Sequence, residues 1–318
     1  MVTVLRILAR RIVLLVPLML GIVLFVFLVM RFSDVDPASA FFQGANPTPQ
    51  QLHDFRVQNG LLDPLPVRYV HFVGALLHGD MGTSALTRAP VLQQVTTALP
   101  LTLQLTFLGL GIAVVLSLLG GVTAAIYRDR LPDQIIRIVS LTGVAAPGFW
   151  LALLMIQYLA VDLGWFPTGG YINPADSLTG WLKTMALPAL ALSLPVAAQL
   201  TRIVRTSVVE ELDKDYVRTA IGSGLPPRVV GRNVLRNALI NPLTVLGLRV
   251  GYLLGGAVVI ETIFSLPGMG KLMIDAVQNG DPAVVQGVVL TTATGFVVVN
   301  LVIDILYLLV NPRLRDAS

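Results

Sequence analysis

The chain has no cysteine, and only 13% of its 318 residues are charged. Without cysteine it can form neither disulfide bonds nor metal sites built from thiolates. The shortage of charge accompanies 55% hydrophobic residues and a mean hydropathy of +0.78, which is more apolar surface than a soluble domain of this length could bury. We therefore expect an integral membrane protein.

A nucleotide-binding loop of the Walker A type is also missing. The stretch Gly268-Met269-Gly270-Lys271 matches it only in part. Ser265 stands at the first glycine position of the motif, and Leu272 replaces the required serine or threonine. If ATP drives this protein, another chain must hydrolyse it.

Histidine is scarce, and the three histidines lie outside the long apolar runs, at His53, His71 and His78. His71 and His78 are two helical turns apart, so no metal-binding cluster is predicted. No histidine is available as a base within the membrane, and no pair of nucleophile and base is evident. An enzyme embedded in the lipid is therefore not expected.

Six apolar runs are long enough to cross a membrane. An α-helix rises about 1.5 Å per residue and the hydrocarbon layer is about 30 Å thick. The first run is longer than the roughly 7–15 apolar residues of a signal peptide core, so we expect a retained helix there. The sequence thus predicts an all-α membrane protein with six transmembrane helices, at residues 12–30, 101–126, 138–161, 184–201, 243–264 and 284–310.

The basic residues predict the orientation of these helices. If the N-terminus is cytoplasmic, 15 of the 22 lysines and arginines fall on the inner side, six fall on or near the outer side, and Arg249 lies within a span. This asymmetry follows the positive-inside rule and places both termini in the cytoplasm. The basic pI of about 9.6 then reflects membrane topology, and no nucleic-acid partner is expected.

The longest connection, residues 33–98, is expected outside the cytoplasm. Thr48-Pro49-Gln50-Gln51 has the pattern of a capping box, and Gly60 is placed to end the helix that follows it. A second short helix is predicted from Pro66 to Gly79, with most of its apolar residues on one broad side. The segment is too small for an independent core, so it is expected to cap the membrane helices. It is either a docking surface for an external partner or a passive lid.

The loop at residues 202–241 is expected in the cytoplasm. Its acids are placed to favour the start of a short helix near Tyr216. Gly222-Ser223-Gly224 breaks this helix, and Pro226-Pro227 opens another. The sequence therefore predicts a helix, a sharp turn and a second helix, preceded by four acids at Glu210, Glu211, Asp213 and Asp215.

Two partners are compatible with this loop. Arg228, Arg232 and Arg236 recur every four residues and form a basic stripe that could contact anionic membrane lipid. Small residues in the first helix and the turn favour a protein instead, because they let another backbone approach closely. These small residues are Thr219, Ala220, Gly222 and Gly224.

The loop resembles the EAA motif of permease subunits in bacterial ATP-binding-cassette (ABC) importers, and more narrowly that of the first permease of dipeptide and oligopeptide systems. The matching residues are Arg218-Thr219-Ala220, Gly224-Leu225 and Leu235-Arg236-Asn237-Ala238-Leu239-Ile240. Asn233 stands where histidine is common, and Asn241-Pro242 displaces the usual proline by one position.

The resemblance covers nearly the whole chain. The family's external segment is matched by Gly60-Leu61-Leu62-Asp63-Pro64-Leu65-Pro66 with Tyr69, and by Gly79-Asp80-Met81-Gly82-Thr83-Ser84. The stretch after its fifth span is matched by residues 261–270, Asp281-Pro282 and Gln286-Gly287, and its C-terminus by Asp304, Tyr307 and Asn311-Pro312-Arg313. Asn311 stands where aspartate is usual.

The resemblance implies a non-catalytic permease with a type I importer fold in the bacterial plasma membrane. Its implied partners are a homologous second permease, two cytoplasmic ATPase subunits and an external substrate-binding protein. ATP and magnesium would be bound by the ATPase subunits, and this chain would bind no cofactor. The implied cargo is a short peptide, with nickel or glutathione as alternatives. The residues implied to contact the ATPase are Tyr216, Arg218, Thr219, Ala220, Gly222, Gly224 and Leu225.

Three charged residues fall within predicted spans, namely Arg249, Glu261 and Asp304. Charges are costly in lipid, so these side chains should face protein, water or one another. Arg249 and Glu261 are about 18 Å apart along one helix and cannot pair directly within it. Each is a candidate for the translocation path or its gate, or else a structural tie between helices.

A self-sufficient, ion-coupled secondary transporter is the alternative of a different class. Its ion site should combine broken helices with acids inside the membrane. Glu261 and Asp304 offer little material for such a site, and no inverted repeat is evident in the sequence.

Overall fold

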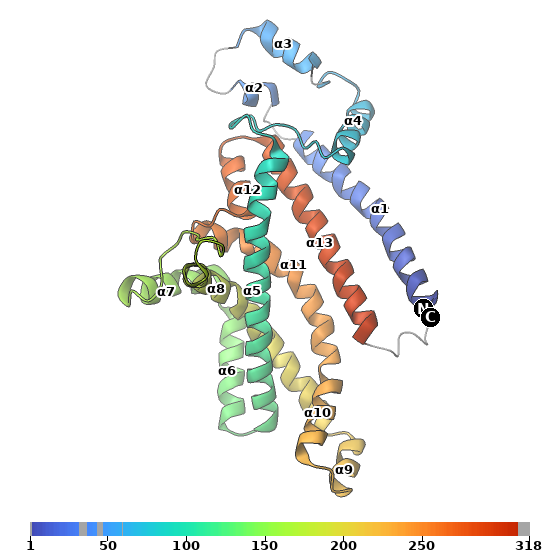
Figure 1. Ribbon diagram of the computed structural model, residues 1–318, viewed down its shortest axis with the longest axis vertical. Coiled ribbons are helices and arrows are strands. Elements are labelled where there is room, and N and C mark those ends of the chain that lie inside the picture. The colour runs from blue at the N-terminus through green and yellow to red at the C-terminus, as the bar shows by residue number, and fades with distance from the viewer. Residues whose placement is uncertain (1, 32–36, 43–46, 59, 311–318) are drawn as a thin grey trace. The chain divides into compact units, whose positions relative to one another are not determined.

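The structure, a computed structural model, describes residues 2–31, 37–42, 47–58 and 60–310 (Figure 1). Helices connected by loops make up these residues, and they include no β-strand beyond one isolated bridge between Thr83 and Pro90. The expectation of an all-α protein is therefore confirmed for the described part of the chain. The chain divides into two compact units, which are described separately: residues 1–102 with 267–298, and residues 103–266 with 299–318.

Four helices within the described residues are long and apolar enough to cross a membrane: α5 (Val91–Ile126), α8 (Leu178–Leu212), α11 (Ile240–Ile263) and α13 (Pro282–Val310). A fifth candidate is the pair formed by α6 (Leu131–Ala145) with α7 (Gly148–Met155) and η1 (Ile156–Asp162). The first predicted run falls in α1 (Val2–Arg31), whose described apolar stretch is Leu15–Val29. All six runs are thus helical apart from a break at residues 146–147 in the third, while the count of six membrane crossings stays a prediction.

In the first unit, α4 (Leu65–Leu77) packs against α1, since the Tyr69 hydroxyl donates to the Leu20 carbonyl at 3.1 Å and Phe27 contacts the rings of Tyr69 and Phe72. The helix expected after Gln50 is α3 (Pro49–Gln58). Its capping box is formed as predicted: the backbone N–H of Thr48 donates to Gln51 Oε1 at 2.8 Å, and that of Gln51 donates to Thr48 Oγ1 at 3.2 Å.

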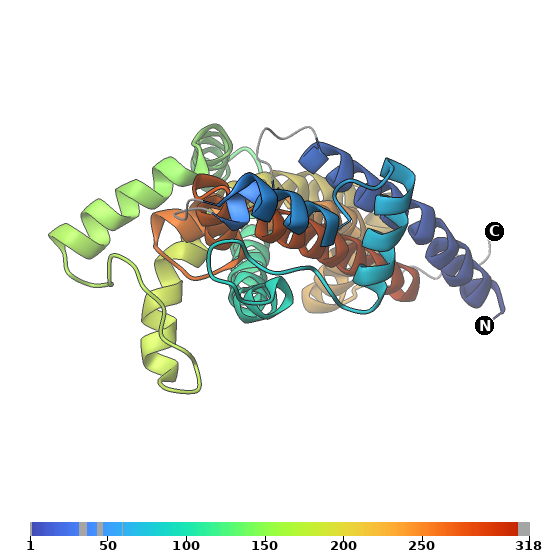
Figure 2. The same ribbon diagram turned by 90° about the horizontal axis from the view of Figure 1, so that it is seen from above.

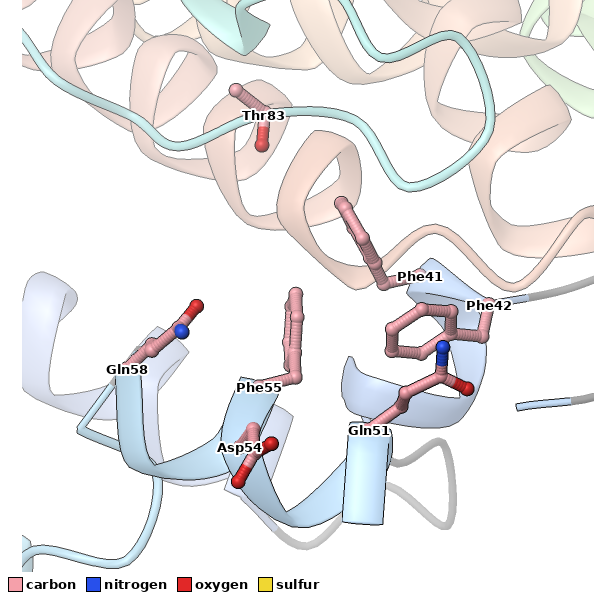
Figure 3. A pocket seen from close by; sticks show the side chains of 7 residues that line it. All are labelled: Phe41, Phe42, Gln51, Asp54, Phe55, Gln58 and Thr83. Carbon is pink, nitrogen blue, oxygen red and sulfur yellow. The ribbon is translucent and has the colours of Figure 1, made fainter. Parts of the chain in front are cut away.

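A short helix that the sequence did not predict, α2 (Pro37–Phe41), lies beside α3. Phe41, Phe42 and Phe55 contact one another at ring-centroid distances of 4.5 to 5.8 Å. A pocket of about 450 Å³ opens beside these rings (Figure 3). The remainder of its lining consists of Gln51, Asp54, Gln58 and Thr83.

Residues 79–90 are fastened to the start of α13. The Ser84 hydroxyl donates to Asp281 Oδ2 at 2.5 Å, and the Leu86 N–H donates to the same oxygen at 3.3 Å. Asp281 is buried and also accepts from the backbone N–H of Val284. Next to this contact, the start of α5 packs against α13 and α12 (Met269–Gln278) through a cluster that includes Val91, Met269 and Val288.

In the second unit, the third apolar run is not the single straight helix expected from the sequence. The chain bends by 103° between α6 and α7, at Ala146-Pro147. Pro147 has no N–H to continue the hydrogen bonds of α6, and it holds Ala146 in an extended conformation with ψ of 125°. Beyond the bend, the chain runs away from α6 along α7 and η1 and then connects through residues 163–177 to α8 (Figure 2).

Helix α8 is the centre of this unit, and α6, α7, α10 (Pro227–Ala238) and α11 all pack on it. Small residues let the neighbouring helices approach closely. A Cβ added to Gly121 on α5 would lie 2.6 Å from the Val204 side chain on α8, and one added to Gly143 on α6 would lie 2.9 Å from Ala198. Real Cβ atoms do not approach so closely, so these contacts require glycine.

Candidate functional site

The helix, turn and helix predicted for the loop are present as α9 (Asp215–Gly222), a turn at residues 223–226 and α10. Residues 202–212, which the sequence had assigned to the loop, continue α8. Gly224 has φ of +75°, a backbone conformation that favours glycine. Figure 1 shows α9 and α10 together at the lower end of the second unit.

The inner side of this segment is apolar. Val217 of α9 and Val230, Val234 and Ala238 of α10 are buried against α8 and the end of α5. Val204 and Val208 of α8 and Ala125 of α5 complete the cluster. The cluster fixes α10 well, because α10 contributes three buried residues, whereas α9 contributes only Val217.

The outer side of the segment exposes three large apolar side chains among polar ones. Ile221 is 62% exposed, Leu225 45% and Val229 43%. Arg218 lies beside them with 74% of its side chain exposed. We call this surface the loop face; it consists of Tyr216, Arg218, Ile221, Gly222, Leu225 and Val229. Apolar side chains gathered in this way and bordered by charge are typical of an interaction site.

The predicted contact residues fall mostly on the outer side. Tyr216, Arg218, Thr219, Gly222, Gly224 and Leu225 are exposed, but Ala220 is partly buried and packs against the apolar cluster. Gly222 is informative because it is helical, its φ is not positive, and a Cβ added to it would meet nothing within 4 Å. The fold of this chain therefore gives no reason for glycine there.

A polar cluster that the sequence did not predict joins the two short helices to α8. The Tyr216 hydroxyl donates to Glu211 Oε1 at 2.8 Å, and Lys214 Nζ lies 2.5 Å from Glu211 Oε2. Asn237 on α10 donates through Nδ2 to the Tyr216 hydroxyl at 3.3 Å. Burial and the neighbouring Glu211 carboxylate raise the pKa of Tyr216, so its phenol stays protonated and can donate.

The end of α8 is also bonded to the turn between α5 and α6. Arg128 Nη1 donates to Asp213 Oδ2 at 2.9 Å. Two turns earlier on α8, Arg205 donates to both carboxylate oxygens of Asp133 on α6. The backbone N–H of Asp129, in the turn itself, donates to the same carboxylate at 2.9 Å. The last turns of α8 therefore connect α9, α10 and α6.

The charged residues of the predicted spans lie in different surroundings. Arg249 on α11 is partly buried, and its buried Nε has no hydrogen-bond partner among the described residues. Glu261, in the last turn of α11, is fully buried. The side chain of Asp304 lies outside the described residues.

The C-terminal end of α11 contacts the loop before α8. The Gly170 N–H donates to the Phe264 carbonyl at 3.0 Å, and a Cβ added to Gly169 would lie 2.6 Å from the same oxygen. Ser265, the next residue, has φ of +51°. The chain is therefore closely packed and tightly turned just beyond Glu261. Among the described residues, no group of three or more histidines and acids could hold a metal ion.

Comparison with known proteins gives two family matches. Residues 117–316 match the family described as "Binding-protein-dependent transport system inner membrane component". Residues 4–106 match the family described as the N-terminal part of the membrane component of such systems. Together the matches cover most of the chain, including the helix-turn-helix segment.

Three similar proteins extend over nearly the whole chain. A putative peptide transport system permease protein of Brucella abortus is 38% identical over 307 residues, which cover 96% of this chain and 98% of the relative. The glutathione transport system permease protein GsiC of Salmonella typhimurium is 38% identical, with coverage of 96% and 97%. The di/tripeptide transport system permease protein DppB of Pseudomonas aeruginosa is 40% identical over 328 residues, with coverage of 96% and 98%.

Proposed function

Because the chain belongs to the family of inner-membrane components of binding-protein-dependent transport systems, we propose that it is a permease subunit of an ATP-driven importer of short peptides. With a second, homologous permease it forms the translocation path. Two cytoplasmic ATPase subunits supply the energy, and an external binding protein delivers the cargo. The chain itself carries out no covalent chemistry.

The observation that carries this proposal is the loop face. Its apolar side chains are exposed, and no contact within this chain requires glycine at position 222. A partner whose surface comes close to α9 accounts for both features, since a larger side chain at 222 would hold that surface away. The ATPase is this partner, and the contact residues are Tyr216, Arg218, Thr219, Gly222, Gly224 and Leu225, with Ala220 supporting them from below.

The topology that follows has six membrane spans and both termini in the cytoplasm. The pair α6 and α7 supplies the third span or a broken equivalent of it. The helix-turn-helix segment then lies on the cytoplasmic side of the bacterial plasma membrane, as the positive-inside rule also requires. Residues 33–98 lie outside, where α3, α4 and the pocket beside Phe55 are accessible to the binding protein.

The translocation path involves α11. Arg249 is its best candidate, because a guanidinium with an unpaired buried nitrogen calls for an anionic or carbonyl partner that cargo or the second permease can supply. Glu261 is fully buried, which favours a gate or a tie between helices over direct contact with cargo in this conformation. Asp304 remains a candidate on its sequence position alone.

The cargo is a dipeptide or tripeptide. Two of the similar proteins are named for peptides and one for glutathione, which is itself a tripeptide with a modified linkage. Glutathione is therefore the second candidate. The binding protein sets selectivity in such systems, so the cargo is identified with that protein present.

The test is to isolate the intact complex through a tag on this chain. We expect a second permease, two ATPase subunits and an external binding protein, with ATP hydrolysis stimulated by the binding protein loaded with peptide. Uptake should be compared for a dipeptide, a tripeptide, glutathione and nickel. If the chain alone in vesicles moved cargo with only an ion gradient, the proposal would be overturned in favour of a secondary transporter.

A further inference from the structure

Helix α9 is held to α8 and α10 by little buried apolar surface. It is eight residues long, and Val217 is its only buried residue. A short helix held by one fully buried side chain, with only the small Ala220 partly buried beside it, can rotate about that point with little loss of burial. A load applied to the loop face would then turn α9 and would not move α8. A second point of attachment is needed if α9 is to transmit force.

Glu211 provides that second point. It lies in the last turns of α8 and is 6% exposed. Both of its carboxylate oxygens are occupied, Oε1 by the Tyr216 hydroxyl at 2.8 Å and Oε2 by Lys214 Nζ at 2.5 Å. Hydrogen bonds to a charged group are short and directional, so this contact fixes the angle of α9 to α8 as well as its distance.

The same cluster includes α10. Asn237, in its last turn, donates to the Tyr216 hydroxyl at 3.3 Å. Tyr216 therefore accepts from α10 while it donates to α8, although it belongs to α9. We propose that Glu211, acting through Tyr216, is the positioning residue that makes α9 move with α8, so that ATPase movement reaches the membrane helices. This inference rests on the proposed function.

The buried position of Glu211 separates it from the contact residues. Because only 6% of it is exposed, it cannot itself bind the ATPase, unlike Tyr216. An effect of Glu211 on transport would therefore have to pass through the orientation of α9. The adjacent Glu210 is exposed on the same helix and makes a matched control.

The experiment uses the complete complex in lipid vesicles with Tyr216→Phe, Glu211→Leu, the double variant and Glu210→Leu. Tyr216→Phe keeps the ring and removes only the hydroxyl. Glu211→Leu removes the acceptor and leaves an apolar side chain beside an apolar cluster. The readouts are the amount of ATPase bound to the permease, the rate of ATP hydrolysis, and peptide imported per ATP hydrolysed.

We expect Glu211→Leu to assemble and hydrolyse ATP but to import about ten- to a hundredfold less peptide per ATP, the scale of one lost hydrogen bond to a charged group. Tyr216→Phe should import a similarly small amount of peptide per ATP, whatever its effect on ATPase binding. The double variant should be no worse than Glu211→Leu, because one interaction is removed in both. Glu210→Leu should match the wild type.

Unchanged peptide import per ATP in Glu211→Leu would overturn the positioning role while leaving the proposed function intact. Loss of assembly in that variant would also overturn it, because Glu211 would then serve folding alone. Failure of the wild-type chain to bind any ATPase would instead refute the proposed function itself.

Discussion

Arg205 on α8 donates two hydrogen bonds to Asp133 on α6, from Nε at 2.7 Å and from Nη2 at 2.6 Å. Asp133 is completely buried, and 20% of the Arg205 side chain is exposed. Removing either partner of such a pair costs more stability than the pair contributes in total, because the remaining charge is left buried without a counter-charge.

We expect Arg205→Ala to lower the free energy of unfolding by about 3–5 kcal/mol, since the Asp133 carboxylate would stay buried without its cation. The measurement is denaturant unfolding of the purified chain in detergent. Gln134→Ala, an exposed change next to Asp133, should stay within about 0.5 kcal/mol of the wild type. Equal stability of the Arg205 variant would show that the pair is not formed in the protein.

A second prediction concerns the contact between α5 and α8. Gly121→Ala places a Cβ 2.6 Å from Val204 and 2.8 Å from the Thr201 carbonyl, and a backbone atom cannot move aside cheaply. We expect a loss of about 1–3 kcal/mol of stability from overpacking. Gly111→Ala on the same helix is the control, because its Cβ would meet nothing within 4 Å. That variant should be neutral or slightly stabilised, because alanine favours a helix.

A third prediction tests the loop face by introducing a large side chain. Gly222→Trp should leave folding intact, because the position is open, and should reduce peptide import at least about tenfold by holding the ATPase away. Gly224→Trp is a weaker test, since a φ of +75° would add backbone strain. Gly231→Trp on α10 is the matched control, as this glycine is also open but lies outside the loop face. Import equal to the wild type in the Gly222 variant would contradict the coupling role.

A fourth prediction separates stability from transport at Arg249. Replacing it with methionine removes a buried nitrogen that has no hydrogen-bond partner in the described part of the chain, which should raise the free energy of unfolding by about 1–3 kcal/mol. If Arg249 serves the translocation path, import should fall in the same variant. If Arg249 only ties helices together, its replacement should lower the free energy of unfolding. A fall in both the free energy of unfolding and peptide import would therefore refute the path role.

The helix-turn-helix segment could be predicted from sequence because its signals are local. Pro227 starts α10 at the first helical position, and Gly224 supplies the positive φ of the turn. The capping box at Thr48 was predictable for the same reason. Each of these features depends on residues within four positions of one another.

The bend at Pro147 was harder to predict, because proline alone does not decide it. Pro188 and Pro195 lie inside α8 without breaking it. Helix α8 packs against α5, α6, α7, α10 and α11, and this burial holds it together despite the missing hydrogen bonds. Local sequence does not reveal how many neighbours a helix will have.

Glu211 was named from sequence only as one of several acids before a helix. Its burial and its contact with Tyr216 depend on α9 folding back against α8, and its link to Asn237 spans much of the segment. A charged residue beside Leu212 and Asp213 gives no signal of burial by itself. Contacts of this kind require the three-dimensional arrangement.

The bond between Ser84 and Asp281 joins residues 197 positions apart in the chain. Residues 79–90 are therefore synthesised long before Asp281, and most of the protein must be inserted into the membrane before the bond can form. The segment stays undocked throughout that interval. A chain truncated before Asp281 cannot form this bond, so residues 79–90 should be cleaved by protease more readily even when every earlier helix has been inserted.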